Sequence, residues 1–586
     1  MFRTNSCGEL TAKHVGGRVT LAGWVHRRRD HGGLVFIDLR DRAGLVQVVF
    51  NPETSGEVHE VATKLRHEYV VQVSGEVARR PQGTENPNLA TGDVEVIAQE
   101  ARILNPSKTP PFYINEDSEV DENLRLRYRY LDLRRPRMRD NILLRHRVIK
   151  FMRDFLDDRG FIEIETPILI KSTPEGARDY LIPSRVHPGK FYALPQSPQQ
   201  LKQLLMVAGF EKYFQVARCF RDEDLRADRQ PEFTQLDIEM SFVDVEDILA
   251  LMEELFTSLV ETVTPTMRIV KPFPRLTYRD TMARYGTDKP DLRYGMEISD
   301  LADIASHTEF TVFLSALDAG GTVRGICAPA CAHYSRRQLD ELAEFVRERG
   351  AKGLITMPIG EEAARSIVGK FLTKEQRDEI AKRFGATGGD LLCIIAGETK
   401  MVEEALGALR VEMGRRLELI DPKLLVFCFI LDYPLLEKVE GDRWEPMHHP
   451  FTAPKDEDMH LLDSAPEKVY AKHYDLVCNG CEISSGSIRI HVPDLQEKIF
   501  RLLGYSKAEV TQRFGHLLEA FEYGAPPHGG IAPGIDRMVM LLAGEESIRE
   551  VIPFPKNKSA IDVMFDAPSE ISEEQLKELH LKLRLD

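Results

Sequence analysis

Apolar and polar residues alternate along Thr234–Phe242 (TQLDIEMSF), and this pattern predicts a β-strand with one buried and one polar face. The apolar positions are Leu236, Ile238, Met240 and Phe242, and the polar ones are Gln235, Asp237 and Glu239. Tyr213–Phe220 is also β-prone, so the charged segment Arg221–Phe233 joins two strands. A polar sheet face beside Arg221 and Glu223 suits an anionic ligand. A solvated hairpin with surface charges would show the same pattern.

Short β-prone segments separated by turns fill the N-terminal part of the chain. They span residues 19–26, 34–39, 45–50, 69–77 and 94–98, and together they predict a small barrel. Arg29, Phe36 and Gln47 fall on neighbouring strands. Barrels that bind oligonucleotides hold unpaired bases with such cations, aromatic rings and amides. A core phenylalanine beside a solvated arginine turn is the alternative.

A proline-rich, charged segment follows at Asn105–Asp132 and predicts a linker or hinge. Apolar residues then recur at helical spacing over Asn141–Arg159, which predicts an amphipathic helix that ends at Gly160. The next residues, Phe161–Thr166, predict a strand. Pro167 ends it, because proline cannot donate a hydrogen bond to a β-ladder.

Two further segments before residue 286 offer polar groups to a ligand. Thr173–Asp179 predicts a loop, and Ala193–Met206 begins with a turn and continues as a helix with Gln199 and Lys202 on one face. A solvated first helical turn would give the same pattern. Residues 286–420 then alternate short strands and helices. They predict an inserted α/β domain in which we find no catalytic constellation.

The segment after residue 420 begins with a very apolar strand, Leu424–Leu431. The adjacent His448 and His449 suit a structural or substrate-contact role better than a metal site, because neighbouring residues seldom ligate one ion. Asp475 and Glu482 lie near a Gly/Ser turn. Two such carboxylates can hold Mg²⁺ beside a phosphate ligand, although isolated acids are more often solvated.

A glycine-rich segment begins the last apolar helix, at His528–Gly544 (HGGIAPGIDRMVMLLAG). Its glycines allow another group to approach the backbone closely, and Arg537 falls in the first helical turn. A helix N-terminus with an arginine suits an anion or a nucleotide. Glycine-rich helix starts without such a role are also common.

Composition and charge refine this organisation. With 586 residues and 42% apolar content, the chain has room for about three or four domains with hydrophobic cores. The net charge of −16 argues weakly against a nucleic-acid partner. However, residues 1–50 hold eight Lys/Arg against four Asp/Glu, and residues 121–160 hold twelve against seven. Basic patches therefore lie within an acidic protein.

The N-terminus and the cysteines indicate a cytoplasmic protein. The start, MFRTNSCGEL, has no apolar signal core, and no run of 18 apolar residues occurs, so we expect no membrane span. The eight cysteines are few for this length, and we expect free thiols. Cys478 and Cys481 form a C-x-x-C pair, but no second pair with zinc-ribbon spacing follows.

Three of these patterns resemble the signature motifs of class II aminoacyl-tRNA synthetases. The helix–strand unit before Pro167 resembles motif 1, Phe220-Arg221-Asp222-Glu223 resembles motif 2, and Gly534-Ile535-Asp536-Arg537 resembles motif 3. With the barrel, the QSPQQLKQ helix start, the paired histidines and the insertion, the whole chain is similar to the aspartyl-tRNA synthetases of bacterial type.

The resemblance implies an α+β multidomain fold. Its expected parts are an OB-fold anticodon-binding barrel at 1–105, a hinge at 106–138, an antiparallel-sheet catalytic domain at 139–285 and 421–586, and the inserted α/β domain (GAD-like) at 286–420. The second catalytic part would carry motif 3 and a C-terminal extension.

The resemblance also assigns roles to individual residues. It implies catalytic roles for Arg221, Glu223 and Arg537. It implies ATP binding by Arg221, Asp222, Glu223, Gln230, Glu482, Gly534, Ile535, Asp536 and Arg537, and Mg²⁺ binding by Asp475 and Glu482. It implies aspartate binding by Glu175, Ser197, Gln199, Lys202, Arg221, Asp237, His448 and Arg489. Two cations, Lys202 and Arg489, would favour the side-chain carboxylate of aspartate over the amide of asparagine.

An enzyme of this family forms an aspartyl-adenylate from L-aspartate and ATP and passes the aspartyl group to tRNA, by positioning and electrostatics. Arg29, Phe36 and Gln47 would read the anticodon. His31 and Gly83 resemble the non-discriminating subtype, which charges both tRNA(Asp) and tRNA(Asn). A downstream amidotransferase would then be a partner. Motif 1 implies a homodimer.

Alternatives to this function stay open. A discriminating enzyme would charge tRNA(Asp) only, and His31 and Gly83 would then be neutral loop residues. An asparaginyl or lysyl enzyme shares the barrel and the motifs, but Lys202 with Arg489 favours an acidic substrate. A non-enzymatic tRNA-binding paralogue would have no need for the ATP-pocket residues.

Overall fold

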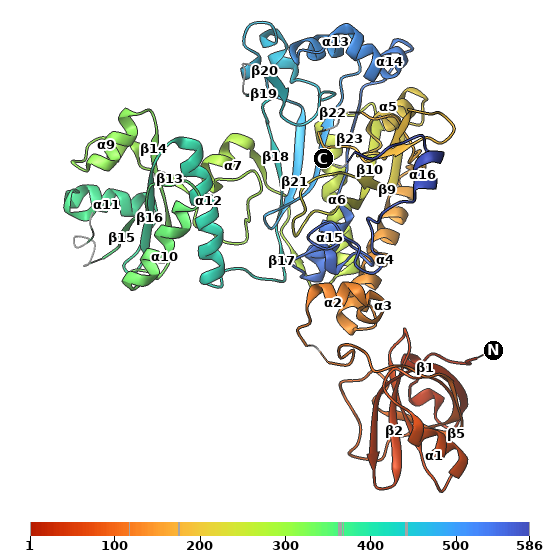
Figure 1. Cartoon of the computed structure of the whole chain (residues 1–586). Coiled ribbons are helices and arrows are strands. Elements are labelled where there is room, and N and C mark those ends of the chain that lie inside the picture. Colours follow the sequence, from red (N-terminus) through yellow and green to blue (C-terminus); the bar gives the residue numbers. More distant parts are fainter. Residues whose placement is uncertain are drawn as a thin grey trace. The chain divides into compact units, whose positions relative to one another are not determined.

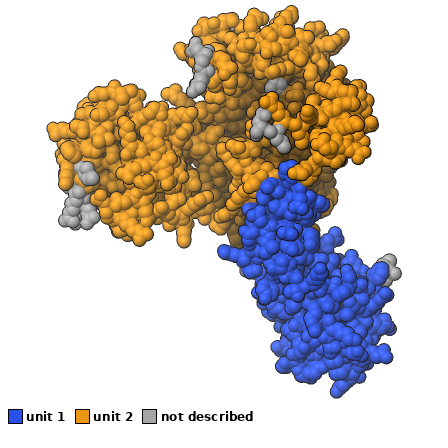
Figure 2. Space-filling model, viewed as in Figure 1, with its two compact units in different colours: residues 1–140, 553–557, 561–568 blue, residues 141–552, 558–560, 569–586 orange. Residues whose placement is uncertain are grey.

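The computed structural model describes residues 2–116, 118–173, 176–360, 366, 368–439 and 443–584. These residues belong to two compact units (Figure 2). Unit 1 comprises residues 1–140, 553–557 and 561–568, and unit 2 comprises 141–552, 558–560 and 569–586. None of the helices in the described ranges has the length and apolar character needed to cross a membrane.

Unit 1 contains the expected N-terminal barrel (Figure 1). Its strands are β1 (Arg18–His31), β2 (Leu34–Arg40), β3 (Leu45–Phe50), β4 (Val70–Arg79) and β5 (Val94–Asn105), closed in the order β1-β2-β3-β5-β4. Helix α1 (Gly56–Lys64) lies between β3 and β4 in the sequence. Alternate strand residues such as Leu21, Ile37 and Val48 are fully buried inside the barrel. The OB-fold prediction is confirmed.

Strand β1 extends beyond the predicted strand, which ended at residue 26. The segment Arg27–His31 lacks apolar alternation, yet its backbone still pairs with β2, so that Arg29 lies opposite Phe36. Pairing therefore continues to the turn at Gly32 and Gly33, where both residues have positive φ. Backbone hydrogen bonds, rather than side-chain burial, define this end of the strand.

The segment predicted as a linker also contains regular structure. It forms α2 (Glu122–Arg127) and α3 (Arg129–Asp132). Asp132 is fully buried and accepts hydrogen bonds from Arg125 at 3.1 Å and Arg129 at 2.6 Å. A buried carboxylate is stable only with such partners, so this cluster anchors both short helices.

Unit 2 is built on a large sheet. In the described residues eight strands follow the order β12 (Arg275–Thr277), β18 (Phe427–Leu431), β21 (His473–Cys478), β22 (Cys481–Ile488), β23 (His528–Ile531), β10 (Glu232–Ser241), β9 (Lys212–Phe220) and β6 (Ile162–Glu163). The pairs β12–β18 and β6–β9 at the two edges are parallel. The inner pairs are antiparallel.

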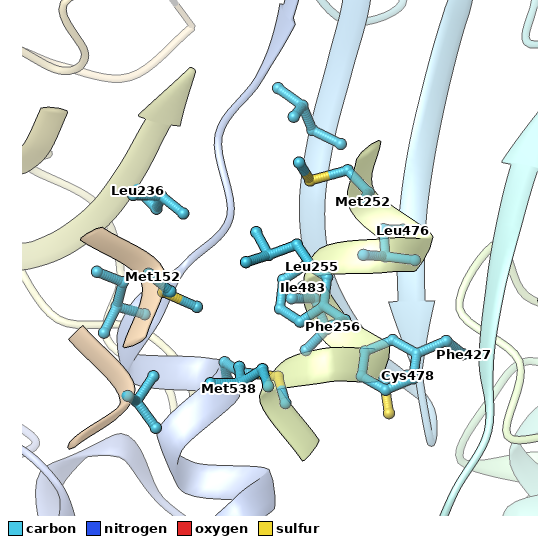
Figure 3. Close-up of a cluster of buried hydrophobic side chains, with 14 of the residues drawn as sticks. Met152, Leu236, Met252, Leu255, Phe256, Phe427, Leu476, Cys478, Ile483 and Met538 are labelled. Carbon is cyan, nitrogen blue, oxygen red and sulfur yellow. The ribbon is translucent and has the colours of Figure 1, made fainter. Parts of the chain in front are cut away.

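Three helices cover one face of this sheet: α4 (Pro136–Asp157), α6 (Val245–Val263) and α15 (Ile535–Ala543). Figure 3 shows their side chains meeting those of the strands, with Met152, Phe256 and Met538 facing Leu236 and Phe427. Asp244 caps α6. The apolar residues of α6 recur at helical spacing, so one face of the helix packs on the sheet. Because the helices cover the apolar face, the other face is left for polar side chains.

Residues between β12 and β18 form a second, antiparallel sheet with its own buried clusters. Its strands are β13 (Ser299–Asp300), β14 (Thr322–Ala328), β16 (Leu391–Gly397) and β15 (Ile355–Pro358). The associated helices are α8 (Ala302–Ala305), α9 (Thr311–Asp318), α10 (Arg336–Arg347), α11 (Lys374–Arg383) and α12 (Thr399–Arg416). This mixed content agrees with the α/β character predicted for the insertion.

The remaining α-helices in the described part of unit 2 are α5 (Gln199–Val207), α7 (Tyr278–Tyr285), α13 (Pro493–Leu502), α14 (Lys507–Glu522) and α16 (Glu573–Glu578). Small strand pairs are β7 (Leu181–Pro183) with β8 (Phe191–Ala193), β11 (Arg268–Ile269) with β17 (Leu424–Leu425), and β19 (Leu436–Val439) with β20 (Arg443–Pro446). Gly286 ends α7 with φ +66°, and a Cβ there would lie 2.0 Å from the carbonyl oxygen of Glu403 in α12. Only glycine permits this close helix contact.

Several predicted boundaries were wrong. The predicted strand Phe161–Thr166 is reduced to the two residues of β6, which pair with Tyr213 and Phe214 of β9. Phe242 is not on the buried face: it lies beyond the end of β10 with φ +60° and is 69% exposed. The apolar strand Leu424–Leu431 is divided between β17 and β18, which pair with different partners.

Replacing Phe427 by alanine tests the core of unit 2. The ring is fully buried and stacks on Phe273 at 4.9 Å and Phe256 at 5.4 Å. We expect the free energy of unfolding to fall by about 3–5 kcal/mol, measured by urea unfolding with circular dichroism. Tyr523→Ala, at a ring 80% exposed, is the control and should leave the urea midpoint nearly unchanged. Equal shifts for both variants would contradict this packing.

Candidate functional site

A cavity of about 340 Å³ opens on the polar side of the large sheet. It brings together most of the residues that the sequence singled out: Ser197, Gln199, Lys202, Arg221, Glu223, Gln230, Asp237, His448, Glu482, Arg489, Gly534, Asp536 and Arg537. They come from α5, the β9–β10 hairpin, the segment after β20, β22 with the residues after it, and α15. Residues that are far apart in the sequence therefore lie together in one site.

A few expected site residues lie elsewhere. Asp222, Ile535 and Asp475 are not part of the cavity lining. The backbone of Asp222 pairs with Arg178, and Ile535 is fully buried in the hydrophobic core. Glu175, on the loop predicted at Thr173–Asp179, lies outside the described residues.

Arg221 lies in the cavity wall beside the start of the β9–β10 loop. Its guanidinium is 5.0 Å from the centroid of the Phe233 ring. Among the residues that the structure describes, none forms an ion pair with Arg221. The nearby Glu223 pairs with Arg229 at 3.1 Å instead. The cavity therefore presents a cation that is not neutralised by the protein.

The end of the cavity near α15 combines a helix start with a second arginine. Gly534 is the N-cap residue of α15. Arg537 donates to the carbonyl oxygen of Glu482 at 2.8 Å and pairs with Asp228 at 3.0 Å. Asp536 accepts from the backbone N–H of Thr234 at 2.8 Å and also pairs with Arg145, so it is a structural link between the helix and β10.

Four buried charged side chains form a network at the cavity floor, where Lys202, Asp237 and Arg489 line the cavity and Glu239 lies behind them. Lys202 Nζ lies 2.7 Å from Asp237 Oδ1 and 3.3 Å from Glu239 Oε2. Arg489 donates to both oxygens of Glu239, at 2.9 and 3.1 Å, and to Ser487 Oγ at 2.7 Å. All four charged side chains are at least nine-tenths buried. Each cation therefore has a carboxylate partner before a ligand arrives.

The two carboxylates of this network respond differently to burial. Burial by itself would raise the pKa of Glu239, but Arg489 and Lys202 lower it to about 2. Burial raises the pKa of Asp237 above its usual value despite the charge of Lys202. Glu239 is therefore the more firmly ionised partner.

The adjacent histidines His448 and His449 make separate contacts. His448 stacks on His473, with ring centroids 3.7 Å apart, rather than acting with its neighbour His449. His473 Nε2 lies 3.0 Å from Asp475 Oδ1. In the described ranges, His448, His473 and Asp475 form the cluster whose ligand atoms could surround one ion. Burial lowers the pKa of both His448 and His449 to about 3, so both rings are neutral near pH 7.

The two carboxylates expected at a Mg²⁺ site differ in position. Both oxygens of Asp475 have protein partners, His473 and the hydroxyl of Tyr433 at 2.8 Å. Glu482 lines the cavity, with Oε2 2.8 Å from Lys289 Nζ and Oε1 3.8 Å from Arg537 Nη1. One cavity carboxylate fits Mg²⁺ that takes its other ligands from phosphates and water. Asp475 fits that role less well.

Sequence reasoning missed three residues at this site. Glu239 was placed on the correct strand face but not in the ligand set, although its period-two relation to Asp237 was the available signal. The same signal was available for His473, which shares one face of β21 with Asp475. Lys289 had no local signal, because its contact with Glu482 joins residues far apart in the sequence.

In unit 1 the residues predicted to contact nucleic acid also gather on one sheet face. Arg29 donates to Gln47 at 3.0 Å and to Asp38 at 2.9 Å, and it lies opposite Phe36. Phe36 is half-buried and is outside the barrel core. The core-phenylalanine alternative is therefore wrong. Gly83 has φ +86° and open space around its Cα.

Comparisons with known proteins agree with this architecture. Residues 121–558 match the family described as tRNA synthetases class II (D, K and N), and residues 19–104 match the OB-fold nucleic acid binding domain. The chain is 58% identical to the aspartate--tRNA(Asp/Asn) ligase of Dehalococcoides mccartyi over the full length of both. It is also 58% identical to the enzyme of that name from Moorella thermoacetica, covering 99% of this chain and 97% of the relative.

A solved structure has a similar fold at low sequence identity. It is the asparaginyl-tRNA synthetase from Pyrococcus horikoshii complexed with asparaginyl-adenylate. The TM-score is 0.59 at 20% identity, covering 95% of this chain and 98% of the other.

Replacing Glu239 by glutamine tests the buried network. We expect the variant to lose about 3–5 kcal/mol of stability at neutral pH, because two buried cations lose their shared anion. The pKa of Glu239 is lowered from 4.5 to about 2. Its contribution is therefore complete above pH 4.5 and is lost as the pH falls through about 2.

Urea midpoints measured at several pH values check this prediction, and the difference between wild type and variant should shrink below pH 4.5. Glu254→Gln removes an exposed carboxylate that pairs with Arg159 and is the control, with little effect on the urea midpoint. A penalty for E239Q that does not depend on pH would contradict an ionised Glu239.

Proposed function

Since this chain belongs to the class II tRNA synthetases (D, K and N), we propose that it ligates L-aspartate to tRNA through an aspartyl-adenylate and charges both tRNA(Asp) and tRNA(Asn). The observation that carries this proposal is the cavity, where the unneutralised Arg221 lies with a buried pair of cations, Lys202 and Arg489. ATP and an amino acid with an acidic side chain are the anions that such a site would accept.

Arg221 would contact both the α-phosphate of ATP and the α-carboxylate of aspartate. A cation held there before binding stabilises the charge that develops when the carboxylate attacks phosphorus and pyrophosphate leaves. Glu223 and Gln230 would hold the nucleotide, and Arg537 with the N-terminus of α15 would meet its phosphates and base. Glu482 is the carboxylate that would hold Mg²⁺, which supplies positive charge to the phosphates when bound.

Substrate specificity would depend on the buried network. Lys202 and Arg489 would donate hydrogen bonds to the side-chain carboxylate of aspartate beside Glu239 and form ion pairs with it, whereas the neutral amide of asparagine offers one acceptor oxygen and no negative charge. Asp237, with Ser197 and Gln199 in the same cavity wall, would hold the ammonium group. His448, neutral near pH 7, would contact the substrate without adding charge.

In unit 1, Arg29, Phe36 and Gln47 would hold anticodon bases by stacking and hydrogen bonds. We attribute acceptance of tRNA(Asn) to His31 and Gly83. His31 is exposed at the end of β1, and the surroundings of Gly83 are open. A long side chain at residue 83 would fill that space. Relatives with 56–58% identity are named for both tRNAs, which supports the broader specificity.

Two partner proposals complete this function. Near β6, Ile162, Ile168 and Leu169 are exposed by 47–52%, which supports a homodimer through the motif 1 region. An amidotransferase would consume Asp-tRNA(Asn), because this mischarged product requires conversion of its side-chain carboxylate to an amide.

Replacing Arg221 by glutamine tests adenylate formation. We expect kcat/KM for aspartate-dependent pyrophosphate exchange to fall by about 10²–10³, as for loss of one preorganised electrostatic group. Arg226→Gln, on the same loop but exposed, is the matched control and should retain exchange close to that of wild type. Pyrophosphate exchange by the wild type in the absence of aspartate would contradict the proposal.

Charging assays test the tRNA specificity. With labelled aspartate at one fixed salt concentration, we expect comparable charging of tRNA(Asp) and tRNA(Asn). The double variant His31→Leu, Gly83→Lys should lose about tenfold or more in charging of tRNA(Asn) while retaining tRNA(Asp). If wild type charges tRNA(Asp) alone, the broader specificity is wrong although the ligase function stands.

A further inference from the structure

The turn Thr287–Asp291 (TDKPD), near the start of the predicted insertion, contacts the hairpin that carries Glu482. Lys289 Nζ is 2.8 Å from Glu482 Oε2, and the two side chains are 36% and 27% exposed. The turn also packs on the hairpin tip: a Cβ on Gly480 would lie 3.6 Å from the Cβ of Asp291. The mechanism proposed above leaves Lys289 without a role.

The position of this turn is fixed by helix α12. Arg410, which is 1% exposed, donates to the backbone oxygens of Asp291 and Tyr294 at 2.8 Å and of Gly295 at 3.1 Å. Its guanidinium lies between the rings of Tyr285 and Tyr294, at 5.0 and 4.3 Å from their centroids. A rigid, planar group with several donors makes these contacts at once. The inserted segment therefore holds the turn that carries Lys289.

We propose that Lys289 is a positioning residue for ATP binding, which orients the Glu482 carboxylate and compensates its charge before metal arrives, and that the inserted segment fixes Lys289 through Arg410. The inference rests on the proposed function, since it needs a nucleotide in the cavity. It gives the inserted segment a physical role at the phosphate end of the site.

The charges around Glu482 predict how loss of Lys289 would change ATP binding with and without Mg²⁺. Without Lys289, the nearest cation described at this carboxylate is Arg537, at 3.8 Å and already paired with Asp228. The negative carboxylate would then repel the triphosphate of metal-free ATP. Bound Mg²⁺ would supply the missing positive charge. Loss of Lys289 should therefore weaken metal-free ATP binding much more than binding of the metal complex.

The test is calorimetric titration of ATP into the full-length protein, once with EDTA and once with saturating Mg²⁺. For Lys289→Met we expect the Kd of metal-free ATP to rise about tenfold and that of Mg·ATP to change less than about threefold. Lys289→Arg, which keeps the charge, should stay within about threefold of wild type in both. Lys382→Met removes an exposed lysine of the inserted segment and is the control, with no expected change.

The outcomes separate this inference from the proposed function. Equal weakening of both Kd values by K289M, or no weakening, would overturn the role of Lys289. Wild-type binding that disappears in EDTA would overturn it equally, since Lys289 would then not compensate Glu482. If wild type binds no ATP even with Mg²⁺, the proposed function fails first.

Arg410→Lys tests the part assigned to the inserted segment. Lysine keeps the charge but lacks the planar fork that reaches three carbonyl groups between two rings. We expect the Kd ratio between metal-free and Mg²⁺-bound ATP to rise about threefold, with the melting temperature recorded to verify folding. A folded R410K with the wild-type ratio would overturn this link.

Discussion

The structure of unit 2 depends on the burial of four charged side chains in the centre of its sheet. Moving an ion out of water costs several kcal/mol, so Lys202, Asp237, Glu239 and Arg489 are tolerated only because each has a close partner of opposite charge. This requirement fixes the neighbouring backbone as well. A Cβ on Gly530 would lie 2.0 Å from Glu239 Oε2, so the strand beside β10 must carry glycine there.

The same constraint separates the two faces of β10. Leu236 and Ile238 pack on the helices, whereas Asp237 and Glu239 face the cations of the cavity floor. A shift of the strand by one residue would place carboxylates in the hydrophobic core and leucine in the site. The apolar core and the charge network therefore fix the same register of β10. Together they determine the geometry of the cavity.

This coupling explains what the sequence could predict. Alternation along Thr234–Phe242 predicted the strand and its polar face, because burial on one side leaves a period of two. The alternation gave the wrong position for Phe242, because the chain turns away from the sheet there. The helices within the predicted linker were also missed, because they are anchored by the buried Asp132. Most of the candidate site followed from motif resemblance. The pair of Lys289 with Glu482 did not, since it joins residues distant in sequence. The pair of His473 with Asp475 was also missed, although both lie on one face of the same strand.

The insertion occupies a place where the fold already requires a long connection. β12 and β18 are parallel, with Arg275 opposite Phe429, and parallel neighbours need a crossover rather than a tight turn. Lys289 lies early in this crossover and Arg410 late in it, and the contacts of Arg410 with residues 291–295 tie its two ends together. A segment closed in this way can fold around its own core and still hold one side chain against the site. That closure is the physical reason why the inserted segment can hold Lys289 against Glu482, a residue of the cavity wall, from outside the cavity lining.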